Sequence, residues 1–229
     1  MTITSTGLTK AAGAAAAVAG SIYVAVQIKH PAMQVASTES TEWVVRNGAK
    51  MVFTALGLAG ITGMYVRHHR RVGVLGLIGY LLFAAGLLVM FSVVLIAAAM
   101  LPALALVNPG YVNDIVVAAD GGVPAGDIGG MQTVFYASAV GYLGGGLLFG
   151  IALFRARVLA RWAAALLAVG AACTAALAVL PDSFNRPIAV PVGVALNGLG
   201  VSLWRDQSRP APAVVPTATS APVPEPATR

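Results

Sequence analysis

The chain has 229 residues, of which 58% are hydrophobic and 10% are charged, and its mean hydropathy is +0.84. A soluble domain carries about 25% charged residues, and a soluble globule of this length could not keep so much apolar surface away from water. These values exclude a soluble protein and predict a single integral membrane domain. The net charge of +6 does not point to nucleic acid, because the basic residues lie in short loops beside apolar segments. Membrane lipids, and anionic headgroups at the basic loops, are the expected partners.

Six apolar segments predict an all-α fold, a polytopic six-helix transmembrane bundle. The transmembrane domain is expected over residues 11–205, after a short N-terminus of residues 1–10. Its predicted spans cover about residues 11–28, 47–66, 72–100, 131–154, 158–180 and 188–204. We expect the first span to be a retained helix rather than a signal peptide, because no clear small-residue cleavage site follows it. Pro102 is expected to end or kink the third span.

A short outer surface helix is predicted from Pro109 to Asp120, because Asn108 can cap it and proline suits the first helical turn. Its apolar residues share one face, so we expect the helix to lie flat on the outer leaflet. These residues are Val112, Ile115, Val116 and Ala119. Residues 206–229 are rich in proline, alanine and threonine, which predicts a disordered cytoplasmic tail.

Charge divides the predicted loops into two sets. Ten of the fourteen lysines and arginines fall on one side of the predicted bundle: Lys10, Arg67, Arg70, Arg71, Arg155, Arg157, Arg161, Arg205, Arg209 and Arg229. Six of the eight acids fall on the other side: Glu39, Glu42, Asp114, Asp120, Asp127 and Asp182. Basic residues concentrate in cytoplasmic loops, so this pattern predicts a multi-pass protein of the plasma membrane with both termini in the cytoplasm.

The predicted spans contain almost no ionisable groups. Apart from Lys50 and Arg161 near span ends, none holds an aspartate, glutamate, lysine, arginine or histidine. Proton relays and ion-coupled carriers usually need such groups. Three deep polar residues could instead line a path for a ligand, namely Gln132, Tyr142 and Asn197. For Asn197 we favour a hydrogen bond between helices over contact with a substrate.

Glycines three or four residues apart predict close approach of helices. They are Gly57, Gly60, Gly63, Gly73, Gly76, Gly79, Gly141, Gly145, Gly146 and Gly150. Packing within one chain and a seam between copies are both compatible with this spacing, and we favour packing within the chain. A homo- or hetero-oligomer stays open.

The outer loops supply side chains of the types used in hydrolytic or divalent-metal sites. They are His30, Glu39, Glu42, Asp114, Asp120, Asp127 and Asp182. Their spacing matches no ligand or nucleophile motif, and the single cysteine, Cys173, has no partner for a disulfide. No catalytic residue, metal ligand or cofactor is therefore assigned.

A series of short motifs runs in order along residues 10–205. It comprises His30-Pro31, Trp43, Tyr65-x-Arg67, Gly73-Val-Leu-Gly76-Leu-Ile-Gly79-Tyr80, Leu101-Pro102-Ala103-Leu104-Ala105, Gly144-Gly-Gly-Leu-Leu-Phe-Gly150-Ile-Ala-Leu-Phe154-Arg155-Ala156, Arg161-Trp162-Ala163, Leu180-Pro181, Val190-Pro191-Val-Gly193, Leu199-Gly200 and Leu203-Trp204. This order resembles a family of uncharacterised six-span membrane proteins of high-GC Gram-positive bacteria, a domain of unknown function. The resemblance implies six helices and an inner-membrane location, and it brings no reaction, substrate or catalytic residue.

Three functions are compatible with these features. The favoured one is a non-catalytic membrane protein, structural or accessory, that packs with lipid or with a membrane partner. The alternative is a carrier or channel for a neutral or amphiphilic small molecule, lined by Gln132, Tyr142 and Asn197. The second alternative is a metal-dependent enzyme at the outer face, which requires His30 and the loop carboxylates to converge.

Overall fold

The computed structural model describes residues 4–28, 30, 32–175 and 189–206, and the part described is helical with no strand, as predicted. The C-terminal tail expected over residues 206–229 lies, after Asp206, outside this part. In chain order the elements are α1 (Ser5–Gln27), α2 (Val35–Thr38), α3 (Thr41–Ala99), α4 (Leu101–Ala105), α5 (Pro109–Ala119), α6 (Met131–Ala139), the π-helical turn η1 (Val140–Gly144), α7 (Gly145–Ala156), α8 (Arg161–Ala175) and α9 (Val190–Asp206).

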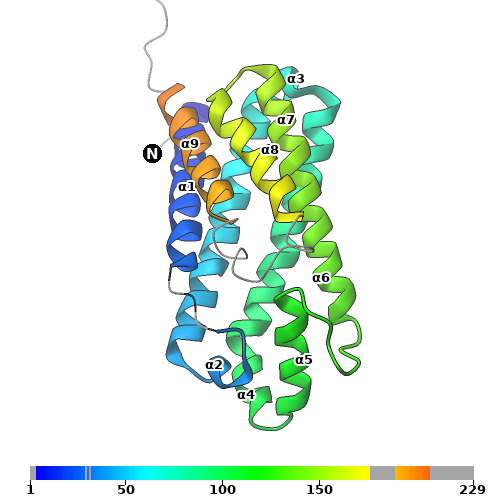
Figure 1. The fold of residues 1–229 in the computed structure, drawn as a ribbon. Coiled ribbons are helices and arrows are strands. Elements are labelled where there is room, and N and C mark those ends of the chain that lie inside the picture. Colours follow the sequence, from blue (N-terminus) through cyan, green and yellow to red (C-terminus); the bar gives the residue numbers. More distant parts are fainter. Residues whose placement is uncertain (1–3, 29, 31, 176–188, 207–229) are drawn as a thin grey trace, which may run out of the picture.

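Helix α3 has 59 residues and folds back on itself (Figure 1). A straight helix of this length would extend about 88 Å, but Gly73 has a φ of 61° and a ψ of −157°, which breaks the helix into two arms. The arms are antiparallel neighbours, because the Tyr65 and Tyr80 rings stack at 4.6 Å and the hydroxyls of Thr62 and Tyr80 lie 3.2 Å apart. A glycine suits this position, since a side chain at positive φ would be strained.

Three helices are long and apolar enough to cross a membrane: α1, α3 and the continuous stretch Met131–Ala156. This supports a membrane protein, but the count does not support the six spans predicted from the sequence. Two predicted spans lie in the single helix α3. The described parts of α8 and α9 have 15 and 17 residues, and residues 176–188 between them lie outside the described part.

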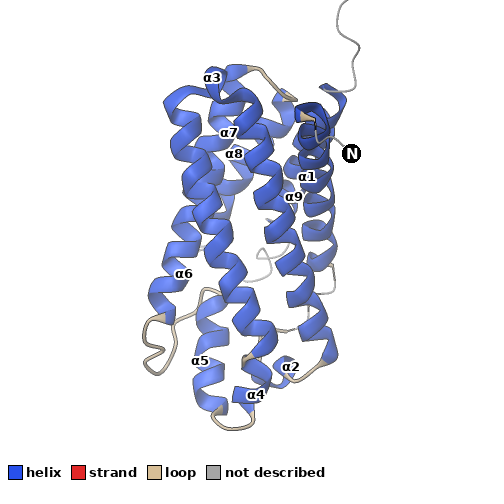
Figure 2. Ribbon diagram, turned by 180° about the vertical axis from the view of Figure 1, so that it is seen from behind, coloured by secondary structure: helices blue, strands red, loops and turns tan. Residues whose placement is uncertain are grey.

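A small apolar cap lies at the end of the molecule formed by α2, α4, α5 and the start of α6 (Figure 2). Helix α5 has the predicted cap, since Asn108 Oδ1 accepts a hydrogen bond of 3.1 Å from Tyr111 N. Most of the predicted apolar face is not available to lipid, however, since Ala119 is the one residue of its four that is exposed. Val112, Ile115 and Val116 are buried in a cluster with Trp43, Leu101, Ala105 and Ile128. The helix therefore uses its apolar face inside the protein instead of lying flat on a membrane.

Helices α1 and α9 pack antiparallel through glycines spaced seven residues apart, Gly13 and Gly20 on α1 and Gly193 and Gly200 on α9. A Cβ atom at Gly13 would lie 2.8 Å from the carbonyl oxygen of Gly200, and one at Gly193 would lie 2.9 Å from that of Gly20. Such distances leave no room for a side chain. The two backbones are therefore in direct contact, which places the start of α1 beside the end of α9 (Figures 1 and 2).

The predicted glycine motifs also serve contacts within the chain. Gly60 and Gly63 lie against Ala16 and Ala12 of α1, and Gly150 lies against α8. Gly86, which the spacing analysis did not single out, faces Gly141 and Tyr142 at backbone distance. These contacts agree with the favoured explanation, close packing of helices within one chain.

Candidate ligand-binding cavities at the basic end

Four segments with basic residues meet at one end of the bundle, which we call the basic end. It is made by the start of α1, the turn between the arms of α3, the connection from α7 to α8 and the end of α9 (Figure 1). Two observations join these segments. Asp206 interacts electrostatically with His68 of α3, and Ala160 N donates a hydrogen bond of 3.0 Å to Ser202 Oγ of α9. The basic end carries Lys10, Arg67, Arg70, Arg71, Arg155, Arg157, Arg161 and Arg205.

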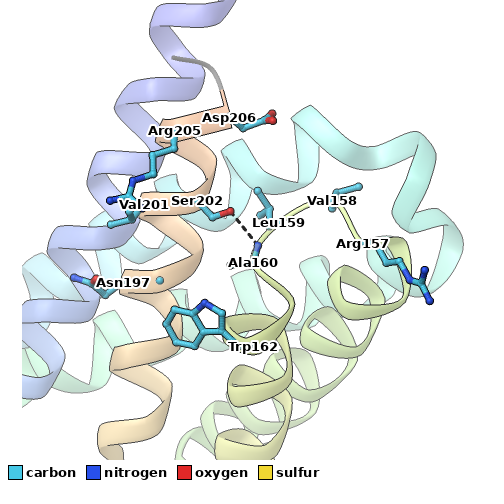
Figure 3. Close-up of a pocket in the computed structure, with 11 residues that line it drawn as sticks. Arg157, Val158, Leu159, Ala160, Trp162, Asn197, Val201, Ser202, Arg205 and Asp206 are labelled. Carbon is cyan, nitrogen blue, oxygen red and sulfur yellow. Dashed lines mark hydrogen bonds between the residues drawn. The ribbon is translucent and has the colours of Figure 1, made fainter. Parts of the chain in front are cut away.

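The larger cavity, of about 480 Å³, opens between α9 and the connection that leads into α8 (Figure 3). Its volume falls in the range of about 300–1,000 Å³ that small-molecule sites occupy. Trp162 and Val201 supply apolar surface, and Arg157 and Arg205 lie on opposite sides of it. The Trp162 ring packs on Gly198 so closely that a Cβ atom at Gly198 would collide with the ring. Even so, 59% of the Trp162 residue is exposed.

Asn197 contributes to the wall of this cavity, as Figure 3 shows. Its amide nitrogen donates hydrogen bonds of 3.1 Å to the carbonyl oxygen of Ala17 and 2.9 Å to Ser21 Oγ, both on α1. Both amide hydrogens are thus used between helices, which is the role that the sequence favoured. The amide oxygen is the group left to contact a ligand.

Of the three residues predicted to line one path, only Asn197 lines the larger cavity. Tyr142 is buried in the turn η1, edge-on to Phe83 at a ring distance of 5.5 Å and tilted against Tyr23 at 6.5 Å. Gln132 is half-buried in the first turn of α6. Neither of them lines the larger cavity, where only Asn197 is found.

A second cavity, of about 310 Å³, lies between the residues of α3 on either side of the break at Gly73 and the end of α7. Arg71 and Arg155 line it, together with five apolar residues: Val72, Val74, Leu75, Ala152 and Ala156. It lacks the acidic residue that the larger cavity has in Asp206. The charge pattern predicts both arginines in cytoplasmic loops but does not pair them, because nothing in the sequence indicates that α3 and α7 are neighbours.

At the opposite end of the molecule, His30 and Glu42 each interact with a basic side chain. The ammonium group of Lys50 lies 3.0 Å from His30 Nε2, which accepts a hydrogen bond from it when the imidazole carries its proton at Nδ1. Arg46 forms an ion pair of 2.8 Å with Glu42 and also donates to the carbonyl oxygen of Val26 at 3.1 Å. These contacts join the end of α1 to the start of α3.

Two of the aspartates predicted to face outwards organise the loop before α6. Asp114 accepts hydrogen bonds from the backbone nitrogens of Ala125 at 3.0 Å and Gly126 at 3.1 Å, and Asp127 accepts one of 2.7 Å from Gly129. Asp182 lies outside the described residues. Within the described part of the chain, no three histidine, cysteine, aspartate or glutamate side chains are grouped to hold a metal ion.

Comparisons of the chain with protein-family models, with curated proteins and with solved structures found no match. What the protein does therefore has to be inferred from its own geometry. The two features that bear on function are the direct backbone packing of the helices and the two cavities at the basic end.

Proposed function

We propose that the chain is a non-catalytic integral membrane protein, structural or accessory, which packs with lipid or a membrane partner and contacts anionic headgroups at its basic end. The observation that carries this proposal is the contrast between the two parts of the bundle. Helices meet at backbone distance along Gly20 and Gly86, whereas both cavities open among the arginines of the basic end. Such a molecule presents closely packed helices and a charged end to the bilayer.

The topology that we propose has six spans, with both termini on the cytoplasmic side of the plasma membrane. The antiparallel arms of α3 support two spans in place of one, and the shared location of the basic segments supports a single cytoplasmic end. Helices α8 and α9 would supply the fifth and sixth spans together with residues outside the described part. Membership of the six-span family that the motifs resemble belongs to the same proposal.

Reconstitution tests this function. Purified full-length protein in liposomes of mixed phosphatidylglycerol and phosphatidylcholine is expected to release entrapped ions, sugars and amphiphilic dyes no faster than protein-free liposomes do. Its thermal stability is expected to rise with the phosphatidylglycerol fraction, because a ligand that binds only the folded state stabilises it. Protein-dependent release of a solute would overturn the proposal.

A carrier for an amphiphilic molecule is the second candidate, and the larger cavity is what favours it. There Asn197 and Trp162 place polar and apolar surface side by side, next to Arg205. A carrier predicts saturable release that Asn197→Ala weakens without unfolding the protein. The same liposomes decide between the candidates, with Gln132→Ala as a control at a residue outside the cavity.

A further inference from the structure

The second cavity brings together two arginines that are far apart in the sequence. Arg71 precedes the break at Gly73, and Arg155 lies in the last turn of α7. Both side chains are exposed and both line the same cavity of about 310 Å³. The fold therefore creates a doubly positive groove between two helices that their sequence separation would not predict.

No carboxylate of the described part lines this cavity or pairs with either arginine. Acids are absent from the cavity lining, and neither arginine forms an ion pair or hydrogen bond with another described residue. Two guanidinium groups in one groove repel each other, and an anion between them converts that repulsion into attraction. Guanidinium groups are planar forks of donors that match the oxygens of a phosphate.

The other residues that line the groove are apolar, which favours the phosphate of a lipid over a free phosphate ion as its ligand. Val72 and Ala152 are buried at 6% and 2% exposure and form its floor, whereas Val74 is 73% exposed. Ile78 and Leu81 continue the face of Val74 along α3 and are 47% and 55% exposed. An acyl chain can lie along this row while its phosphate lies between the arginines.

We propose that the groove between Arg71 and Arg155 is a binding site for the phosphate headgroup of an anionic phospholipid. The site rests on the proposed function, because it requires the basic end to lie at the membrane surface, and it adds a defined location and stoichiometry. Non-specific electrostatic attraction to the membrane surface would involve all the basic residues of the basic end alike. A specific lipid site depends on Arg71 and Arg155.

Native mass spectrometry of the full-length protein, titrated with phosphatidylglycerol in detergent, tests the site. The double variant Arg71→Gln/Arg155→Gln removes both cations from the groove. The matched control, Lys10→Gln/Arg70→Gln, removes the same charge from the same basic end but from residues that line neither cavity. An arginine near an anionic surface contributes enough to change affinity about fivefold, so the double variant is expected to bind about 30-fold more weakly and the control about as tightly as the parent.

Two further arms make the result decisive. Phosphatidylcholine is expected to bind more weakly than phosphatidylglycerol. Millimolar inorganic phosphate is expected not to displace the bound lipid. Displacement by inorganic phosphate at a concentration equal to that of the lipid would overturn the lipid assignment. Where the double variant does not fold, the single variants carry the test, each weakening binding about fivefold while Arg70→Gln does not. Equal losses in the groove variant and the control would overturn the site but leave the proposed function standing. Solute release from liposomes would overturn that function separately.

Discussion

Trp43 Nε1 donates a hydrogen bond of 2.8 Å to the carbonyl oxygen of Ala97, a residue 54 positions later in the chain. The bond joins the first turn of α3 to its last, so it closes the hairpin that the break at Gly73 opens. Trp43 is 4% exposed and lies in the apolar cluster with Val112 and Ile115 of α5. One side chain thus links the hairpin to the cap.

Replacing Trp43 by phenylalanine is expected to destabilise the protein by about 1–3 kcal/mol, because the part-buried carbonyl of Ala97 loses its donor. The change keeps an aromatic ring in the cluster, so the loss reports mainly on the hydrogen bond. Trp162→Phe is the matched control, at a side chain that is 59% exposed, and is expected to change stability by less than about 0.5 kcal/mol. Thermal unfolding followed by circular dichroism in one detergent compares them, and equal midpoints would contradict the role of Trp43.

The seam between α1 and α9 predicts a strong effect of a single methyl group. In Gly20→Ala the new Cβ would meet the backbone of Gly193 and Asn197, which cannot rotate away. The helices must separate, at an expected loss of about 1–3 kcal/mol.

The control for this variant is Gly144→Ala. Gly144 is helical with a φ of −63° and has no atom within 4 Å of a Cβ position, so alanine is expected to be neutral or to stabilise by up to about 1 kcal/mol. Both variants are compared by unfolding midpoint. A Gly20→Ala protein as stable as the parent would show that α1 and α9 are not in direct contact.

The hydrogen bond from Asn197 to Ser21 is measurable by a double-mutant cycle. Asn197→Ala and Ser21→Ala are each expected to destabilise the bundle, and their coupling energy is expected to be about 0.6 kcal/mol, the average for polar contacts between membrane helices. A coupling of zero would mean that this contact contributes nothing to stability. Solute release that changes while stability does not would favour the carrier.

Local features of the chain were predictable because their causes are local. The end of the helix before Pro102 and the Asn108 cap each depend on a few adjacent residues, and both are found in the structure. The fate of the apolar face of α5 was not predictable, because the pattern shows that Val112 and Ile115 seek an apolar neighbour but does not say whether that neighbour is lipid or protein.

The candidate site could not be predicted from the sequence, because it depends on which helices are neighbours in the fold. Gly13 and Gly20 have the same seven-residue spacing as Gly193 and Gly200, a signal that was visible in the sequence, but only the fold indicates that these two helices are partners. Similarly, Arg71 and Arg155 were placed at the same membrane surface by the charge pattern, whereas their common groove depends on the packing of α3 against α7. The sequence could suggest Asn197 as an interhelical donor but could not name Ala17 and Ser21 as its acceptors.

The six-span topology predicts which positions meet the outside of the cell. In a Cys173→Ser background, single cysteines replace Val123, which is 90% exposed in the loop before α6, and Arg70 and Arg157, which are exposed at the basic end. A membrane-impermeant maleimide is expected to label Val123→Cys in intact cells and the two arginine positions only after permeabilisation, since basic loops stay in the cytoplasm. Labelling of Arg70→Cys in intact cells would place the turn of α3 outside and reject the proposed orientation. Labelling of Arg70→Cys and Arg157→Cys from opposite sides would be more damaging, because a single basic end at one membrane surface, and with it the lipid groove between Arg71 and Arg155, could not then exist.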